Sequence, residues 1–326
     1  MIRGPEIPLV RRFPALARVP RARLGLFPTP VVPVGELSSH LWIKRDDLCG
    51  NPMGGNKVRA LEFLLGDLAA NESVVTVGSV GSTHALAVAT YGKRIGVRVT
   101  VARWRQVMNP MAHLVADRIA RDVRRDRAPT FRSPVVAYAW ALRERLRGAR
   151  WIAAGGSTPL GILGHVNAGL ELVDQIEAEM LPQPRYVVVP LGTGGTIAGL
   201  ALAFAIAERP ITVIGARVVP RVVGRRSRVL RLAHRTSALI ERLTGETVPR
   251  VRPSAVRVVH DAYGGAYGRE TEAGRAAAHR LRAARDIALD ATYSAKAFSV
   301  ALDLAAHEPT LFWLTFDARI LASRSP

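Results

Sequence analysis

The chain has 326 residues, a mass of 35.3 kDa and a formal net charge of +20, from 46 basic and 26 acidic side chains. A composition that is 48% hydrophobic excludes an intrinsically disordered protein, because it offers enough apolar surface to offset the entropy cost of folding. The single cysteine, Cys49, excludes an intramolecular disulfide and a cysteine-rich zinc site, and no metal site is expected. The length predicts two domains.

The positive charge is almost entirely arginine, because lysine occurs only at Lys44, Lys57, Lys93 and Lys296. Arginine is concentrated in residues 118–150 and 217–252. Such runs are usually solvated helix faces, and neither region adds exposed aromatics or a recognisable base-reading element. We therefore expect no nucleic-acid partner, although the charge alone keeps a nucleic-acid-binding protein as an alternative.

The N-terminal segment predicts neither export nor membrane insertion. Residues 1–24 place Pro and Arg where a signal peptide needs an apolar run. The most apolar stretch, residues 197–207, is about half as long as the roughly 20 residues that span a bilayer. We expect a soluble, cytoplasmic protein without a membrane partner.

After an irregular, proline-rich start, short apolar runs alternate with helical patterns such as Leu61, Leu64, Leu65 and Leu68. The predicted strands are residues 74–78, 97–102, 151–154, 186–190, 211–216, 256–260 and 310–315. These runs are apolar throughout, which is typical of parallel strands buried on both faces. The pattern predicts an α/β fold of mostly parallel sheets flanked by helices. No obvious linker separates the expected domains, so we expect them to be interleaved.

A strand-like run followed by glycines and an amphipathic helix surrounds Lys57. Gly54 and Gly55 permit a tight turn, and Asn56 is predicted to be the N-cap of the helix. A lysine at the positive end of a helix has a lowered pKa, which helps to supply the neutral amine that Schiff-base chemistry requires. The alternative is a solvated lysine after a glycine turn.

Two further turns could bind anions. Residues 192–196, GTGGT, follow an apolar strand and open an apolar helix, so free N–H groups and the helix dipole could bind a phosphate. The loop is a poor dinucleotide fingerprint because Ile197 replaces the third glycine, although Arg217 keeps an NADP site open. Residues 78–87 form a similar turn, with Ser82 as predicted N-cap and Thr83 and His84 suited to a carboxylate. A lone histidine is also commonly structural.

A Schiff-base lysine, a phosphate loop and a carboxylate turn together describe a pyridoxal-phosphate site. At this point the sequence resembles the 1-aminocyclopropane-1-carboxylate deaminase / D-cysteine desulfhydrase family. The resemblance runs through residues 28–68 and 81–85 (GSTHA), then 154–172 (AGGSTPLGILGHVNAGLEL), 189–200 (VPLGTGGTIAGL), 266–268 (AYG) and 289–298 (LDATYSAKAF). Residues 104–150 and 220–253, which largely coincide with the arginine-rich regions, show little resemblance.

The resemblance implies a fold-type-II, tryptophan synthase β-like enzyme that binds pyridoxal 5'-phosphate between two domains, a small amino acid as substrate, and a homodimer. The larger, cofactor-binding domain would comprise residues 1–59 and 165–326, and the smaller, inserted domain residues 60–164. By position, Lys57 would be the Schiff-base lysine, Asn56 and Gly192, Thr193, Gly194, Gly195 and Thr196 would contact the cofactor, and Ser294 would face its ring nitrogen. The implied catalytic residues are Lys57, Tyr293, Tyr267 and Ser82, and the implied substrate-binding residues are Ser82, Thr83 and His84.

Several positions depart from the family pattern. Gly81 and Thr83 replace a Gln and an Asn, and Leu314, Thr315, Phe316 and Asp317 replace a glycine-containing turn, which places a bulky ring and a carboxylate near the site. A neutral residue at Ser294 makes the cofactor a weaker electron sink, which favours β-elimination of a good leaving group such as a thiol. The resemblance therefore predicts a D-cysteine desulfhydrase-like lyase or deaminase. The alternatives are a 1-aminocyclopropane-1-carboxylate deaminase and a cofactor-binding relative with altered or lost activity.

Overall fold

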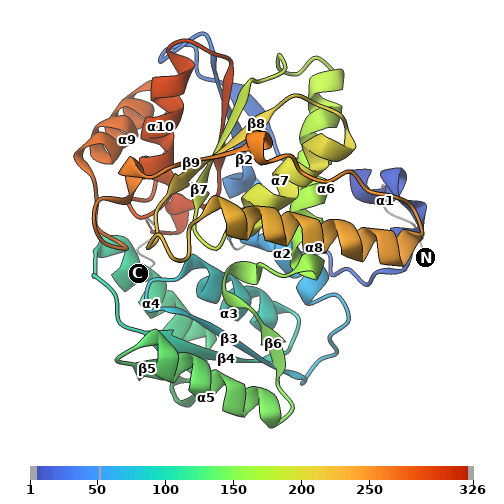
Figure 1. Ribbon diagram of the computed structural model, residues 1–326. Coiled ribbons are helices and arrows are strands. Elements are labelled where there is room, and N and C mark those ends of the chain that lie inside the picture. Colours follow the sequence, from blue (N-terminus) through green and yellow to red (C-terminus); the bar gives the residue numbers. More distant parts are fainter. Residues whose placement is uncertain (1–5, 51–52, 322–326) are drawn as a thin grey trace.

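The computed structural model describes residues 6–50 and 53–321 and contains two sheets (Figure 1). Within those residues, the first sheet has six strands in the order β1 (Val31–Pro33), β2 (Leu41–Arg45), β10 (Thr310–Leu314), β7 (Tyr186–Leu191), β8 (Thr212–Arg217) and β9 (Val256–Val259). The second has four, in the order β5 (Thr130–Phe131), β4 (Arg98–Trp104), β3 (Ser73–Ser79) and β6 (Arg150–Ile152). Every pairing is parallel except that of β1 with β2.

Helices cover both faces of the first sheet. The helices of this part are α1 (Pro8–Arg12), α2 (Asn56–Leu64), α6 (Pro159–Glu177), α7 (Gly195–Ile206), α8 (Arg226–Thr244), α9 (Glu272–Arg285) and α10 (Ser294–Ala305). Val187 and Val189 of β7 pack in the cluster formed with α6, α7 and α8, whereas Val188 between them packs in the cluster formed with α9 and α10. Successive side chains on a strand point to opposite faces, so a strand buried on both faces is apolar at every position.

The second sheet carries α3 (Thr83–Arg94), α4 (Pro110–Asp122) and α5 (Pro134–Leu146), and these elements form the lower half of the molecule in Figure 1. All four of its strands lie within residues 60–164. This placement supports the interleaved arrangement, but the expected domain boundaries stay a prediction. Across the described ranges, every helix is too short or too polar to cross a bilayer.

All seven predicted strands are present, within a few residues of their predicted ends. The irregular N-terminal segment contains a short helix, α1, and residues 1–5 lie outside the described part of the chain. The helices α6 and α7 pack unusually closely, because a Cβ on Gly199 would lie only 2.3 Å from the Cβ of His165. Alanine at position 199 would therefore push apart the two helices that form the centre of the larger core.

Candidate active site

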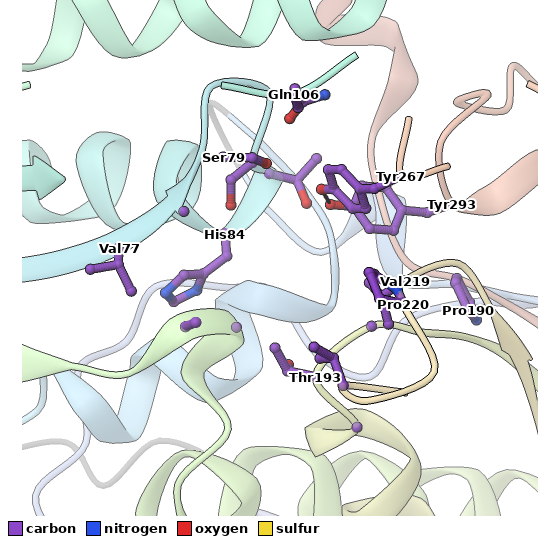
Figure 2. A pocket seen from close by; sticks show the side chains of 18 of the residues that line it. Val77, Ser79, His84, Gln106, Pro190, Thr193, Val219, Pro220, Tyr267 and Tyr293 are labelled. Carbon is purple, nitrogen blue, oxygen red and sulfur yellow. Dashed lines mark hydrogen bonds between the residues drawn. The ribbon is translucent and has the colours of Figure 1, made fainter. Parts of the chain in front are cut away.

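A cavity of about 560 Å³ opens between the two sheets (Figure 2). Its wall is built by segments that follow the carboxyl ends of β3, β4, β6, β7, β8 and β10. Ligands of parallel α/β proteins bind at this end of the strands, where loops and helix N-termini converge. The fold therefore places the glycine turns predicted from the sequence around one space.

Lys57 lies in the cavity wall at the second residue of α2. Its Nζ is 3.5 Å from the carbonyl oxygen of Gly155, and burial lowers the pKa of the amine to about 8. Gly55 precedes the helix with φ +130°, and a Cβ there would lie 2.6 Å from the carbonyl oxygen of Thr315. Glycine is thus needed to bring the lysine turn against the segment that follows β10.

The prediction that Asn56 caps this helix is wrong, because the cap position is Gly55 and Asn56 is the first helical residue. The Asn56 side chain instead donates from Nδ2 to Thr196 Oγ1, 2.7 Å away. Since Thr196 accepts this bond, its own proton is available to a ligand in the cavity. One side chain therefore joins the lysine turn to the glycine loop.

The glycine loop follows β7 and leads into α7, with Gly194 in the left-handed region (φ +93°) at the cap position. Residues 192–197 all line the cavity. The first N–H groups of a helix have no intrahelical acceptor, so those at the start of α7 are available to an anion. Thr193 Oγ1 lies 2.6 Å from Ser157 Oγ, and Ser157 belongs to a family-like block but was not singled out from the sequence.

The turn before α3 presents a second helix N-terminus to the cavity. Ser82 is the N-cap as predicted, and its Oγ accepts a hydrogen bond from the backbone N of Ala85 at 3.2 Å. Thr83 and His84 follow as the first two helical residues, and all three line the cavity. The Ser82 N–H already donates to the carbonyl oxygen of Ser79, but those of Thr83 and His84 begin the helix and make this turn suited to a carboxylate.

His84 is held as a neutral ring. Burial, and the nearby Lys57, lower the pKa of His84 to about 3. Thr76 Oγ1 donates to the carbonyl oxygen of Ile152 at 2.9 Å, so it must accept from His84 Nε2, which lies 3.0 Å away. This network assigns the proton to Nε2.

Tyr267 and Tyr293 meet at their hydroxyl groups in the cavity (Figure 2). Burial raises the pKa of both phenols, and each also reaches a hydroxyl of the other half of the molecule, Ser79 for Tyr267 and Thr83 for Tyr293. Asp290 accepts from the backbone N of Tyr293 at 2.7 Å. The tyrosines are therefore neutral proton carriers held between the two sheets.

Of the expected neighbours of the site, Ser294 and Asp317 do not line the cavity. Ser294 is fully buried at the start of α10 and does not line the cavity, and its hydroxyl faces the carboxylate of Asp290. Phe316 does line the cavity, beside the lysine turn. The Asp317 carboxylate does not, because it pairs with Arg319 at 2.8 Å.

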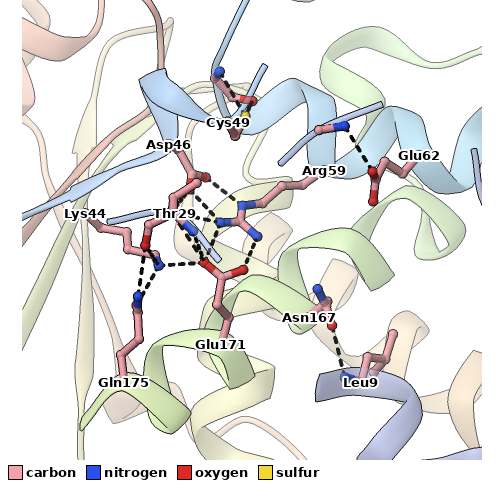
Figure 3. A network of polar contacts seen from close by, with 12 residues as sticks. Leu9, Thr29, Lys44, Asp46, Cys49, Arg59, Glu62, Asn167, Glu171 and Gln175 are labelled. Atoms are coloured by element: carbon pink, nitrogen blue, oxygen red, sulfur yellow. Dashed lines mark hydrogen bonds and ion pairs between the residues drawn. The ribbon is translucent and has the colours of Figure 1, made fainter. Parts of the chain in front are cut away.

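A buried ionic network anchors the helix that carries Lys57 (Figure 3). Arg59 donates to Asp46 at 2.7 Å and to Glu171 at 2.9 Å, and Lys44 donates to Glu171 at 2.6 Å. The two cations and two anions balance, as buried charges must. Burial alone would raise the pKa of Glu171, but Arg59 and Lys44 outweigh it and lower the pKa to about 2. The network joins α2 to β2 and α6 of the larger half.

The cavity residues fit pyridoxal phosphate. Gly192 has open space where a Cβ would stand, Gly194 and Gly195 line the cavity at the start of α7, and a lysine with a lowered pKa lines the same space. A phosphate on the loop and an aldehyde at Lys57 are the two attachments that this cofactor needs. The fold and the cavity thus define an α/β enzyme of the pyridoxal-phosphate class.

Comparison with known proteins agrees with that class. The family model described as "Pyridoxal-phosphate dependent enzyme" matches residues 22–312, and the chain belongs to this family. Its cofactor is therefore pyridoxal phosphate, as expected from the sequence.

The chain is 33% identical over 309 residues to a putative 1-aminocyclopropane-1-carboxylate deaminase of Pyrococcus horikoshii, covering 90% of this chain and 89% of the relative. It is 36% identical over 332 residues to the nocardicin C-9' epimerase of Nocardia uniformis subsp. tsuyamanensis, with 93% and 94% covered. It is 28% identical over 307 residues to the D-cysteine desulfhydrase of Salmonella typhi, with 88% and 89% covered.

A solved structure described as a homologue of ACC deaminase matches with a TM-score of 0.77 and 29% identity, covering 95% of this chain and 98% of that one. The processed form of threonine deaminase isoform 2 from Solanum lycopersicum matches with a TM-score of 0.64 at 18% identity, covering 96% of this chain and 85% of that one, and shows the same fold. The predicted fold class and family resemblance are confirmed.

Proposed function

We propose that this enzyme removes the α-proton of a small amino acid and eliminates its β-substituent, releasing ammonia and a 2-oxo acid, as a D-cysteine desulfhydrase-like lyase. The observation that carries the proposal is that Lys57 faces the same cavity as an anion-binding loop and a carboxylate-binding turn. When bound, pyridoxal phosphate supplies a conjugated ring that stabilises negative charge on the α-carbon.

We assign removal of the α-proton to Lys57. Lys57 would hold the cofactor through its aldehyde, and the Lys57 amine, when it is free, has a pKa that burial lowers to about 8. An amine with a pKa close to the working pH is neutral often enough to accept a proton and basic enough to hold it. Lys57 thus both attaches the cofactor and acts as the base.

The other cavity residues orient the substrate and manage the remaining protons. The N-terminus of α3, with Ser82 and Thr83, holds the carboxylate, and the neutral tyrosine pair supplies a proton to the departing group. The residues of the loop at 192–196, with Asn56, hold the phosphate. The interpretation of Ser294 as the neighbour of the ring nitrogen stays a prediction.

The test is a screen of D- and L-cysteine and of 1-aminocyclopropane-1-carboxylate, with ammonia and 2-oxo acid measured together. Release of sulfide, pyruvate and ammonia from one cysteine enantiomer supports the lyase. Faster turnover of the cyclopropane substrate would instead favour the deaminase and overturn the interpretation of Ser294. Lys57→Ala should abolish turnover and covalent attachment of the cofactor, which mass spectrometry detects after borohydride reduction.

A second candidate is an epimerase, or a relative that exchanges the α-proton without elimination. It is favoured by the 36% identity to the nocardicin C-9' epimerase and by a cavity with two separate proton carriers, Lys57 and the tyrosine pair. Incorporation of deuterium at the α-carbon in D₂O without ammonia release would identify this activity.

We also infer from the family resemblance that the enzyme is a cytoplasmic homodimer. Light scattering of the purified protein measures the oligomeric state directly, and a monomeric mass would contradict the dimer.

A further inference from the structure

The part of the cavity wall built by α5 and by the segments after β4 and β8 is mainly apolar, although Arg105 and Gln106 also line it. We define the outer chamber as the cavity wall formed by Trp104, Val107, Pro134, Tyr138, Pro220 and Val223. All six residues come from the two stretches, 104–150 and 220–253, in which the sequence shows little resemblance to the family. The fold therefore brings the two divergent stretches together at one place, the outer wall of the active-site cavity.

The chamber presents apolar and aromatic surface to open space. Trp104 and Tyr138 stack with ring centroids 6.0 Å apart and planes inclined by 23°. Tyr138 and Val107 remain 42% and 47% exposed. Exposed apolar side chains grouped in a concave wall are typical of a binding surface, and a stacked aromatic pair presents a surface suited to another planar group.

The charges at this wall exclude a basic ligand. Among the described residues that line the cavity there is no Asp or Glu, whereas Arg105 is part of the wall. Arg228 adds a second cation near this wall. It donates to the carbonyl oxygen of Thr193 at 3.2 Å, and its positive charge partly offsets the rise in the pKa of Tyr138 that burial causes. A neutral aromatic group fits this chamber, and a cationic one does not.

Lys57 and the outer chamber line one cavity, so an amino acid bound beside Lys57 can extend into the chamber. We propose that the outer chamber binds an aromatic β-substituent of the amino-acid substrate. This inference rests on the proposed function and names its substrate class, amino acids that carry an aryl or benzyl group on the leaving atom.

For S-benzylcysteine, the α-proton moves to Lys57, the Cβ–S bond breaks with its electron pair on sulfur, and sulfur takes a proton. Water then completes release of phenylmethanethiol, pyruvate and ammonia.

Binding tests the chamber without any requirement for turnover. Phenylalanine and alanine, each as both enantiomers, are titrated into the holoenzyme by calorimetry. Burial of an aromatic side chain predicts that phenylalanine binds about tenfold to a hundredfold more tightly than alanine. The preference should fall in Tyr138→Ala, with alanine affinity unchanged. Leu146→Ala is the matched control, since Leu146 lies on the same helix, is 81% exposed and does not line the cavity.

Equal affinities for phenylalanine and alanine would contradict the proposal that the outer chamber binds an aromatic group, even if the enzyme turns over cysteine. With turnover as readout, kcat/KM for S-benzylcysteine should exceed that for cysteine, and Tyr138→Ala should reverse this order. The proposed function fails in a different way, through the absence of ammonia release from every β-substituted amino acid. Tight phenylalanine binding in that case would still support the chamber as an aromatic subsite.

Discussion

The side-chain amide of Asn109 lies 3.1 Å from the hydroxyl of Thr292, which immediately precedes the active-site Tyr293. The same amide also donates to the carbonyl oxygen of Gly268 at 2.8 Å, next to Tyr267. Its Oδ1 meanwhile accepts from the backbone N of Ala112 and caps α4. One residue of the smaller sheet region therefore contacts the neighbours of both tyrosines.

Asn109→Asp separates these two roles, because aspartate caps a helix as well as asparagine does but cannot donate to Gly268 and Thr292. We expect kcat/KM to fall about tenfold, the effect of losing roughly one to two hydrogen bonds, with the α4 helix retained by circular dichroism. Thr271→Ala is the control, since it removes the cap of α9, which is not part of the cavity. That variant should lose stability but keep kcat/KM, and an Asn109→Asp enzyme with unchanged kcat/KM would contradict the positioning role.

The lowered pKa of Lys57 predicts how cofactor attachment depends on pH. In the cofactor-free protein, the rate of attachment, trapped by borohydride, should rise about tenfold per pH unit up to the pKa of about 8 and then level off. Lys93 provides an internal control, because its side chain is 60% exposed. Peptide mass spectrometry distinguishes attachment at Lys57 from labelling at Lys93, and a Lys57 profile that keeps rising well above pH 8 would contradict the lowered pKa.

Glu171→Gln tests the buried ionic network. Removing one partner of a buried ion pair leaves the other charge uncompensated, so we expect a loss of about 3–5 kcal/mol in the free energy of unfolding by urea. Glu177→Gln is the control, since Glu177 pairs with Arg209 while 56% exposed and should cost less than about 1 kcal/mol. Similar losses in both variants would argue against the network.

The network also predicts an acid limit of stability. The folded-state pKa of Glu171 is about 2, below its ordinary value of 4.5. A depressed carboxyl pKa stabilises the folded state above pH 4.5, and this contribution is lost as the pH falls from 4.5 towards 2. The difference in unfolding free energy between the native protein and Glu171→Gln should therefore shrink over that window, and a constant difference would exclude this linkage.

Thr196→Val tests the phosphate loop. The substitution removes the acceptor of Asn56 and the hydroxyl proton that faces the cavity, so the Kd for pyridoxal phosphate should rise about tenfold. Thr236→Val is the control, because the Thr236 hydroxyl donates within α8 to Leu232 and does not line the cavity. An unchanged Kd in Thr196→Val would remove Thr196 from the phosphate site.

Strand periodicity and glycine turns predicted most of the architecture. Seven strands were recognised because each contains a run of apolar residues, and the central ones are buried on both faces, as the alternating contacts of Val187, Val188 and Val189 show. The two-residue β5 and the proline-ending β1 were missed, since edge strands this short carry no periodic signal. The Asn56 cap was wrong because the side chain has a better partner in Thr196, 140 residues away.

By itself, the sequence determined the class of fold, the lysine turn and the two turns that we expect to bind anions, because turns and helix starts are encoded by neighbouring residues. Only the tertiary structure decided which distant groups meet. It joined the tyrosine hydroxyls, turned Asp317 towards Arg319 and placed Asn109 across the two sheet regions. It also assembled the outer chamber from two stretches without recognisable motifs. Such contacts depend on how parallel strands align their carboxyl ends, which no local pattern of residues contains.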